Sequence, residues 1–367
     1  MKVRELEGVL DPIAPLRFAE SWDNVGLLAG DRDAEVSRVL VTIDLTLGVL
    51  EEARRERASM VVAYHPVILK PVNRLASGHV LFEAIRDGIH VYCPHTALDA
   101  AEGGTNDVLG DVLGMTTRAP LRPVSAAGSG ELKLVTFVPT TDADRVSDAM
   151  FRAGAGVIGA YESCSFRSQG QGTFFGGPEA NPRVGEKGRL ERVAETRVEM
   201  RVRKGVLAAV LEALRSTHPY EEPAFDLLTL EGAGRQEASK VGMGRIGTVT
   251  SIERSALIET IRGALGVSNL LVAGKTTGSV TKVATCAGAG GELLGEAIAK
   301  GAELYLTGEL RHHYALMAVA RGVTVVAALH SNSERITLTS YASKLRERAK
   351  GVEVLVSKVD RDPFSIV

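Results

Sequence analysis

RVLVTID (38–44) begins the stretch that decides the fold of this 367-residue chain. After it come the helical stretch LGVLEEARRER (47–57), the apolar run MVVAY (60–64), the helical stretch HVLFEAIRDG (79–88) and the run IHVYC (89–93). Short β-branched runs that alternate with helices are typical of parallel sheets covered by helices. We therefore predict an α/β fold for this part of the chain.

The same alternation returns in the last third. It consists of IERSALIETIRGAL (252–265), KVATC (282–286), GGELLGEAIAKG (290–301), ELYLTG (303–308), YALMAVARG (314–322) and VTVVAAL (323–329). We interpret the first and last thirds as two halves of one domain that an insertion interrupts, because insertions at exposed loops are tolerated.

The middle of the chain has a different pattern. RPVSAAGSGE (122–131) has the composition of a linker, and strand-like ELKLVTFVP (131–139) and helical DADRVSDAMFRAGAG (142–156) follow it. The glycine-rich stretch 166–188 predicts a hairpin or a mobile loop, and RVEMRV (197–202) and VLAAVLEAL (206–214) add a strand and a helix. We predict a ferredoxin-like α+β insertion at 125–236 between domain halves at 1–124 and 237–367.

Composition excludes several classes of protein. The formal net charge is −2, which gives no electrostatic footprint for nucleic acid, and no apolar run is long enough to span a bilayer. The three cysteines include no CxxC pair, so neither a disulfide framework nor a structural zinc site is indicated. The N-terminal MKVRELEGVL has the apolar spacing of a helix rather than of a secretory signal. We expect a cytoplasmic protein.

Polar side chains follow four of the apolar runs. His65 follows 60–64, His95 and then Asp99 follow 89–93, Glu309 follows 303–308, and His330 follows 323–329. In open α/β sheets, ligands bind in the crevice outside the carboxyl ends of the strands. These positions are therefore candidates for a binding site.

His330 and Glu334 are spaced to share one face of a helix that would begin in HSNSER (330–335), with a capping residue near its start. Imidazole and carboxylate together suit zinc, iron, manganese or cobalt. The same spacing also fits an ordinary helix pair, with Asp99 capping a helix in AAEGGTNDVLGDVLG (100–114). Spacing alone leaves both interpretations open.

Five ordered segments carry a resemblance to a known family. They are SWDNVGLLAGD (21–31), YHPVILKP (64–71), HTALDAAEGGTND (95–107), TGELRHH (307–313) and HSNSER (330–335). Together they resemble the Nif-three-like dinuclear-metal family, also called GTP cyclohydrolase I type 2 homologues. GAGVIGAYESCSF (154–166), GQGTF (170–174) and HPYEEPAFD (218–226) resemble the PII-like and CutA-like insertion of its longer members.

The resemblance implies an α/β sandwich whose halves face each other across a two-metal pocket, assembled as a homohexamer. It implies that His65 and Asp99 are ligands of one ion, that His330 is a ligand of the other, and that Glu334 binds both. Tyr64 stands where many bacterial members have a histidine, and a phenol is a weaker donor than imidazole at neutral pH. We therefore expect one firm metal site beside a weak second one, with one or two ions per chain.

Other polar residues have candidate roles near the metal. Glu309 and His313 are candidates to support a metal ligand or to move a proton, as is His95, although a polar helix start explains Glu309 and His313 equally well. Glycines 288, 290 and 291 fit a tight strand-to-helix turn better than a phosphate site. Cys93 is better explained as a packing residue than as a nucleophile.

Two classes of function fit these features. A metal that activates water would make the chain a hydrolase of an unknown small molecule, and the family label points to GTP cyclohydrolase chemistry without any residue here that specifies guanine. The alternative is a non-catalytic, metal-dependent scaffold or regulatory protein. The sequence does not decide whether catalysis occurs, and a nucleic-acid role is disfavoured by the charge.

Overall fold

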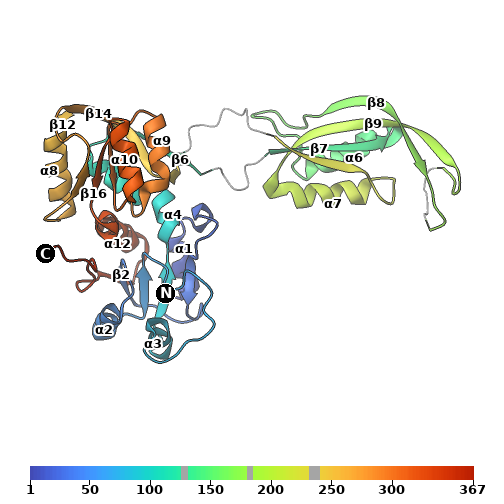
Figure 1. The fold of residues 1–367 in the computed structure, drawn as a ribbon. Helices are drawn as coiled ribbons and strands as arrows, with labels where there is room; N and C mark the ends of the chain where they lie inside the picture. Colours follow the sequence, from blue (N-terminus) through green and yellow to red (C-terminus); the bar gives the residue numbers. More distant parts are fainter. Residues whose placement is uncertain (125–130, 180–184, 231–239) are drawn as a thin grey trace. The chain divides into compact units, whose positions relative to one another are not determined.

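A computed structural model describes residues 1–124, 131–179, 185–230 and 240–367 (Figure 1). The chain divides into two compact units, one made of 1–124 with 237–367 and the other of 125–236. Most of the predicted linker (125–130) and the second predicted boundary (within 231–239) lie outside the described residues. None of the helices in the described ranges has the length and apolar character needed to cross a membrane.

The first sheet of the larger unit has the strand order β1-β4-β3-β2-β17. Its strands are β1 (Gly26–Ala29), β4 (His90–Cys93), β3 (Met60–Ala63), β2 (Arg38–Thr42) and β17 (Glu353–Val356). All neighbours are parallel except β1, which is antiparallel to β4. Alternation along β2 sends Val39 and Val41 to one apolar cluster and Leu40 to another, so both faces of the sheet are buried.

Helices cover both faces of this sheet (Figure 1). The N-terminal α1 (Val3–Leu10) and the late α12 (Thr337–Arg348) pack on one face. The helices α2 (Leu47–Arg55) and α3 (Val80–Arg86) pack on the other. The α/β pattern that the sequence predicts is confirmed, including the N-terminal helix with buried Val3, Leu6 and Leu10.

The second sheet has the order β13-β16-β15-β14-β12-β5. Its strands are β13 (Leu271–Ala273), β16 (Thr324–Ala327), β15 (Leu304–Thr307), β14 (Ser279–Cys286), β12 (Arg245–Glu253) and β5 (Thr117–Ala119). The central β14, β15 and β16 are parallel. One face packs on α5 (Thr105–Val112) and α8 (Arg254–Leu265), and the other on α9 (Leu294–Ala299) and α10 (His312–Ala320).

The two halves exchange elements, which the sequence pattern did not predict. The C-terminal β17 and α12 belong to the sheet of the first third, while β5 and α5 from the first third pack into the second sheet. Neither third therefore completes its own core, and the two thirds form one interlocked unit. The short β6 (Arg122–Pro123) and β11 (Gly242–Met243) pair antiparallel, so the chain leaves and re-enters this unit at one place.

The smaller unit has the element order β-α-β-β-α-β, with all strand pairs antiparallel and the order β10-β7-β9-β8. Its elements are β7 (Glu131–Pro139), α6 (Ala143–Arg152), β8 (Phe166–Phe175), β9 (Leu190–Arg203), α7 (Leu207–Thr217) and β10 (Phe225–Thr229). The described part of the glycine-rich stretch 166–188 enters a hairpin of β8 and β9 rather than a loop alone. The relation to PII-like and CutA-like domains stays a prediction.

Candidate metal centre

The carboxyl ends of strands from both sheets supply the candidate site. Asp44 lies two residues beyond β2, and His65 lies two residues beyond β3. Its backbone N–H donates to the carbonyl of Ile43, which continues the pairing of the strands and fixes the position of the side chain. From the second sheet, Glu309 follows β15 and His330 follows β16.

The helix α11 (His330–Arg335) holds the second histidine and the central carboxylate. It begins at His330 itself, so the expected capping residue within HSNSER is absent, and Leu329 precedes it with a φ of 70°. The one-turn spacing places His330 Nε2 3.3 Å from Glu334 Oε1, as the shared helix face predicts. A positive φ at a leucine is strained, and such strain collects at functional sites.

His65, His330 and Glu334 form the centre of the site, which we call the HHE cluster. Each offers one ligand atom, and these atoms all lie within 4.8 Å of one another. His65 Nε2 is 3.1 Å from Glu334 Oε2, and the two imidazole rings are 5.3 Å apart between centroids. Glu334 is almost fully buried, whereas the two histidines are partly exposed.

A carboxylate fixes the outer nitrogen of each imidazole. His65 Nδ1 lies 2.9 Å from Asp44 Oδ1, and His330 Nδ1 lies 3.0 Å from Glu309 Oε1. Because a carboxylate accepts, each Nδ1 carries the proton and donates it. The lone pair of each neutral imidazole is then on Nε2, which points toward Glu334.

The charges in the HHE cluster are strongly coupled. Burial lowers the pKa of His65, but its interactions with Asp44 and Glu334 outweigh this effect and raise the pKa to about 10. The interaction with Glu334 raises the pKa of His330 to about 9 against the opposing effect of burial. Burial raises the pKa of Glu334, yet the two histidines bring it below its ordinary value. Without another cation, both imidazoles are protonated at neutral pH.

Asp99 lies outside the HHE cluster. It is in α4 (His95–Ala100), and its carboxylate accepts a short hydrogen bond from the Tyr64 hydroxyl, which is also 2.8 Å from Thr105 Oγ1. Burial and the charge of Glu334 raise the pKa of Asp99 to about 6. The helix after it has Gly104 at its N-cap, so the alternative role of Asp99 as a helix cap is wrong.

His330 lies with His65 and Glu334, and Asp99 accepts a hydrogen bond from Tyr64. The assignment of His65 and Asp99 to one ion, and of His330 to the other, stays a prediction. Burial raises the pKa of Tyr64 well above its ordinary value, so its hydroxyl remains protonated and donates.

The other candidate residues lie at different places. The ring of His95 is 5.5 Å from that of His65, and its Nδ1 is 2.8 Å from Asp23 Oδ1. His313 in α10 has a ring contact with Tyr314, 4.3 Å between centroids, and does not belong to the HHE cluster. Of these two histidines, His95 is the one with a ring contact to a member of the HHE cluster.

The glycine-rich turn supports the HHE cluster rather than offering free amides to a phosphate. The N–H of Gly288 donates to Ser333 Oγ, and the N–H of Gly290 donates to Thr307 Oγ1. A Cβ at Gly288 would lie 2.7 Å from Glu334 Oε1 and 3.2 Å from His330 Nε2. Only glycine leaves the space beside these ligand atoms open.

Cys93 is not supported as a nucleophile. It is buried, its Sγ contacts the carbonyl of Tyr64, and burial raises the pKa of its thiol.

The sequence analysis missed two acidic residues of the site. Asp44 orients His65, and Asp23 orients His95. Asp44 ends the run RVLVTID, so the rule that selected the other strand ends would have found it.

Comparisons with known proteins place these residues in a family. The model described as Duf34/NIF3 (NGG1p interacting factor 3) matches residues 1–363. The chain is 35% identical over 363 residues to a Halalkalibacterium halodurans protein named GTP cyclohydrolase 1 type 2 homolog, with 96% of each chain covered. A Mycobacterium leprae protein of the same name is 36% identical over 367 residues, covering 98% of this chain and 94% of its own.

Solved structures agree with this result. A Bacillus cereus protein related to NIF3 is 32% identical, with a TM-score of 0.68 over 100% of this chain and 99% of its own. The Staphylococcus aureus protein SA1388 is 27% identical, with a TM-score of 0.73 over the same shares. The chain therefore belongs to the Duf34/NIF3 family.

Proposed function

We propose that the chain binds a divalent metal ion through His65, His330 and Glu334 and acts as a metal-dependent hydrolase. The observation that carries this proposal is the convergence of two Nε2 atoms and a buried carboxylate, with each outer Nδ1 held by a carboxylate. Histidines that ligate metals are commonly oriented in this way through the second nitrogen.

The buried polar atoms fit a cation. His65 Nε2 and Glu334 Oε2 are both inaccessible and, among the described residues, lack a hydrogen-bond partner of good geometry although they lie 3.1 Å apart. Buried polar atoms ordinarily have hydrogen-bond partners. A cation bound between these two atoms would give both of them a partner. The nitrogen and oxygen donors suit zinc, iron, manganese or cobalt.

Asp99 is the best candidate for an additional ligand. Its pKa of about 6 reflects burial and the nearby charge of Glu334, and a second cation would reduce the repulsion between the two carboxylates. Tyr64 competes for Asp99 through its hydrogen bond and is itself a poor ligand while protonated. We therefore infer one firm site and one weak site.

A bound ion would supply Lewis acidity and a lowered pKa for coordinated water. Around it, Asp44 and Glu309 hold the imidazoles in the ligating tautomer. Glu309 is about half exposed and His95 lies beside His65, so these two are placed to accept or return a proton. The name of the relatives suggests GTP as a substrate, but the HHE cluster itself does not select a base.

The test combines metal analysis with a substrate panel. Purified protein reconstituted with zinc, manganese, iron or cobalt is analysed for metal content and assayed on esters, nucleotides and cyclic amidines. We expect about one tightly bound ion per chain and turnover that Glu334→Gln abolishes together with metal binding. Glu347→Gln, at an exposed position of α12, is the matched control and should change neither.

The alternative outcomes are distinct. Two tightly bound ions per chain would contradict the assignment of one firm site. Metal binding with no turnover on any substrate would reject the hydrolase and favour the metal-dependent scaffold. The homohexamer that the resemblance implies is a further proposal, and analytical ultracentrifugation with and without metal tests it.

A further inference from the structure

An apolar pocket of about 350 Å³ lies beside the HHE cluster. It is lined by residues of β13, β16, α10, the segment after β15 and the C-terminal segment, among them Leu271, Val272, Leu310, Leu329 and Phe364. Its volume is in the range of pockets that hold small molecules.

The pocket and the HHE cluster share residues. Glu309 lines the pocket, and its Oε1 is 3.0 Å from Nδ1 of His330. Leu329 also lines it and is the residue with positive φ that immediately precedes α11. Gly308 lines it as well, and a Cβ there would lie 2.9 Å from the Cα of His330. Residues that line the pocket are therefore in direct contact with His330, a candidate metal ligand.

The lining indicates the chemistry of the occupant. Glu309 is the one charged residue of this lining, and no lysine, arginine or histidine contributes to it. A phosphate placed there would meet a negative charge and no basic donor, whereas an alkyl chain or aromatic ring would bury apolar surface. Leu271 and Phe364 are 64% and 70% exposed, so they present apolar area that such a group would cover.

We propose that this pocket binds the apolar part of a small-molecule substrate, an acyl chain or an aromatic ring, and holds its hydrolysable bond near the HHE cluster. This inference rests on the proposed function. It favours a neutral or cationic substrate over a nucleoside triphosphate. Because β13 is an edge strand of its sheet, a second copy of the chain is the competing occupant, and the experiment distinguishes it from a small molecule.

The probe is N-phenyl-1-naphthylamine, a neutral apolar dye whose fluorescence rises when it is bound. It is titrated into the full-length, zinc-reconstituted chain and two tryptophan variants. Ala315→Trp fills the pocket, whereas Leu316→Trp adds the same side chain at the adjacent, exposed position of α10 outside the lining. We expect Ala315→Trp to weaken the affinity for the dye at least tenfold and Leu316→Trp to leave it within twofold.

Val272→Asp provides a second variant at a partly exposed edge-strand position, in case the larger substitution disturbs folding. It should also weaken the affinity for the dye at least tenfold. Equal dye affinity in all variants would overturn the proposal. A change of oligomeric state in both pocket variants, measured by light scattering, would also overturn it, because a second copy would then be the occupant.

An ester series links the pocket to the HHE cluster. The wild-type chain should hydrolyse p-nitrophenyl octanoate with a kcat/KM at least tenfold above that for the acetate, and Ala315→Trp should abolish this preference. Dye binding that depends on the pocket, without hydrolysis of any ester, would support the binding site and reject the hydrolase. Hydrolysis with no preference for chain length would support the hydrolase and overturn this inference.

Discussion

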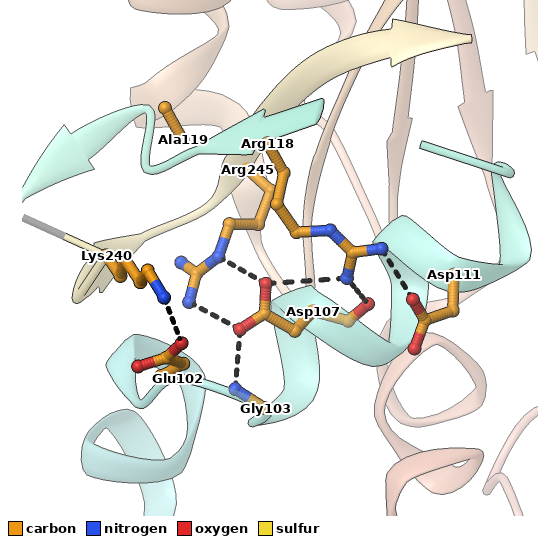
Figure 2. A pocket seen from close by; sticks show the side chains of 8 residues that line it. All are labelled: Glu102, Gly103, Asp107, Asp111, Arg118, Ala119, Lys240 and Arg245. Carbon is orange, nitrogen blue, oxygen red and sulfur yellow. Dashed lines mark hydrogen bonds and ion pairs between the residues drawn. The ribbon is translucent and has the colours of Figure 1, made fainter. Parts of the chain in front are cut away.

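Arg245→Leu should destabilise the larger unit far more than the loss of a surface ion pair. The guanidinium of Arg245 is 1% exposed and lies beside a pocket of about 330 Å³ where the chain re-enters this unit (Figure 2). Its Nε donates to Asp107 Oδ1 at 2.7 Å and its Nη2 to Oδ2 at 3.0 Å. Its other hydrogens reach backbone carbonyls that include those of Gly242 and Ala101.

The size of the destabilisation follows from the buried Asp107 carboxylate that Arg245→Leu leaves without its main partner. The Asp107 carboxylate would keep the Gly103 N–H and the weaker contact with Arg118 at 3.6 Å, but it would lose both bonds to Arg245. Removing one partner of a buried, hydrogen-bonded ion pair costs about 3–5 kcal/mol. For a unit of this size the loss corresponds to a melting temperature lower by roughly 10 °C.

Trp22 is the single tryptophan of the chain and lies in the larger unit, so its fluorescence follows the urea unfolding of that unit. Arg262→Leu is the control, because it removes an exposed ion pair with Glu259, and such surface pairs contribute little to stability. The double variant Arg245→Met with Asp107→Leu should regain much of the lost stability, since no charge remains buried. A free energy of unfolding for Arg245→Leu within about 1 kcal/mol of the wild type would refute this reasoning.

Three further outcomes are expected. Glu309→Gln should weaken zinc affinity about 10–100-fold by calorimetry, because His330 loses its charged acceptor, and unchanged affinity would reject that role. Asp360→Asn should also weaken zinc binding, because its carboxylate joins the N–H of Ile43 to Arg335 in α11; an unaltered affinity would show that this link is not needed. In metal-free protein the pKa of His65 is raised to about 10, so its stabilising charge is complete below about pH 6.5 and is lost as the pH rises through 10. Melting temperatures should therefore fall at alkaline pH in the wild type, and an equal fall in His65→Gln would contradict this assignment.

Local sequence patterns were sufficient to predict the central parallel strands, the helices between them and most of the polar residues at the strand ends. The run MVVAY followed by His65 is an example, because a buried parallel strand needs a continuous apolar run and ends at the ligand-bearing edge. The pairing of β17 with β2 was not predictable in this way. It joins Glu353 to Arg38 across more than 300 residues, and no short-range pattern encodes such a partner.

The supporting residues were the hardest to predict. Asp360 reaches Ile43 and Arg335 from a C-terminal segment without helix or strand, where a carboxylate ordinarily signals only solvent exposure. The helix α11 begins within HSNSER as predicted, but the capping residue expected there is absent. The structure instead has Leu329 in a strained conformation before His330, where a Cβ at Gly288 or Gly308 would crowd the histidine.

The charges of the HHE cluster balance one another without an ion. Glu334 is buried near Asp99, an arrangement that requires nearby positive charge. In the metal-free chain the two imidazoles supply it, with pKa values of about 10 and 9. A divalent cation that displaces both protons leaves the local charge unchanged, since two positive charges replace two. If the proposed cation binds, the features that raise these pKa values would preserve the pocket beforehand and would couple binding to proton release.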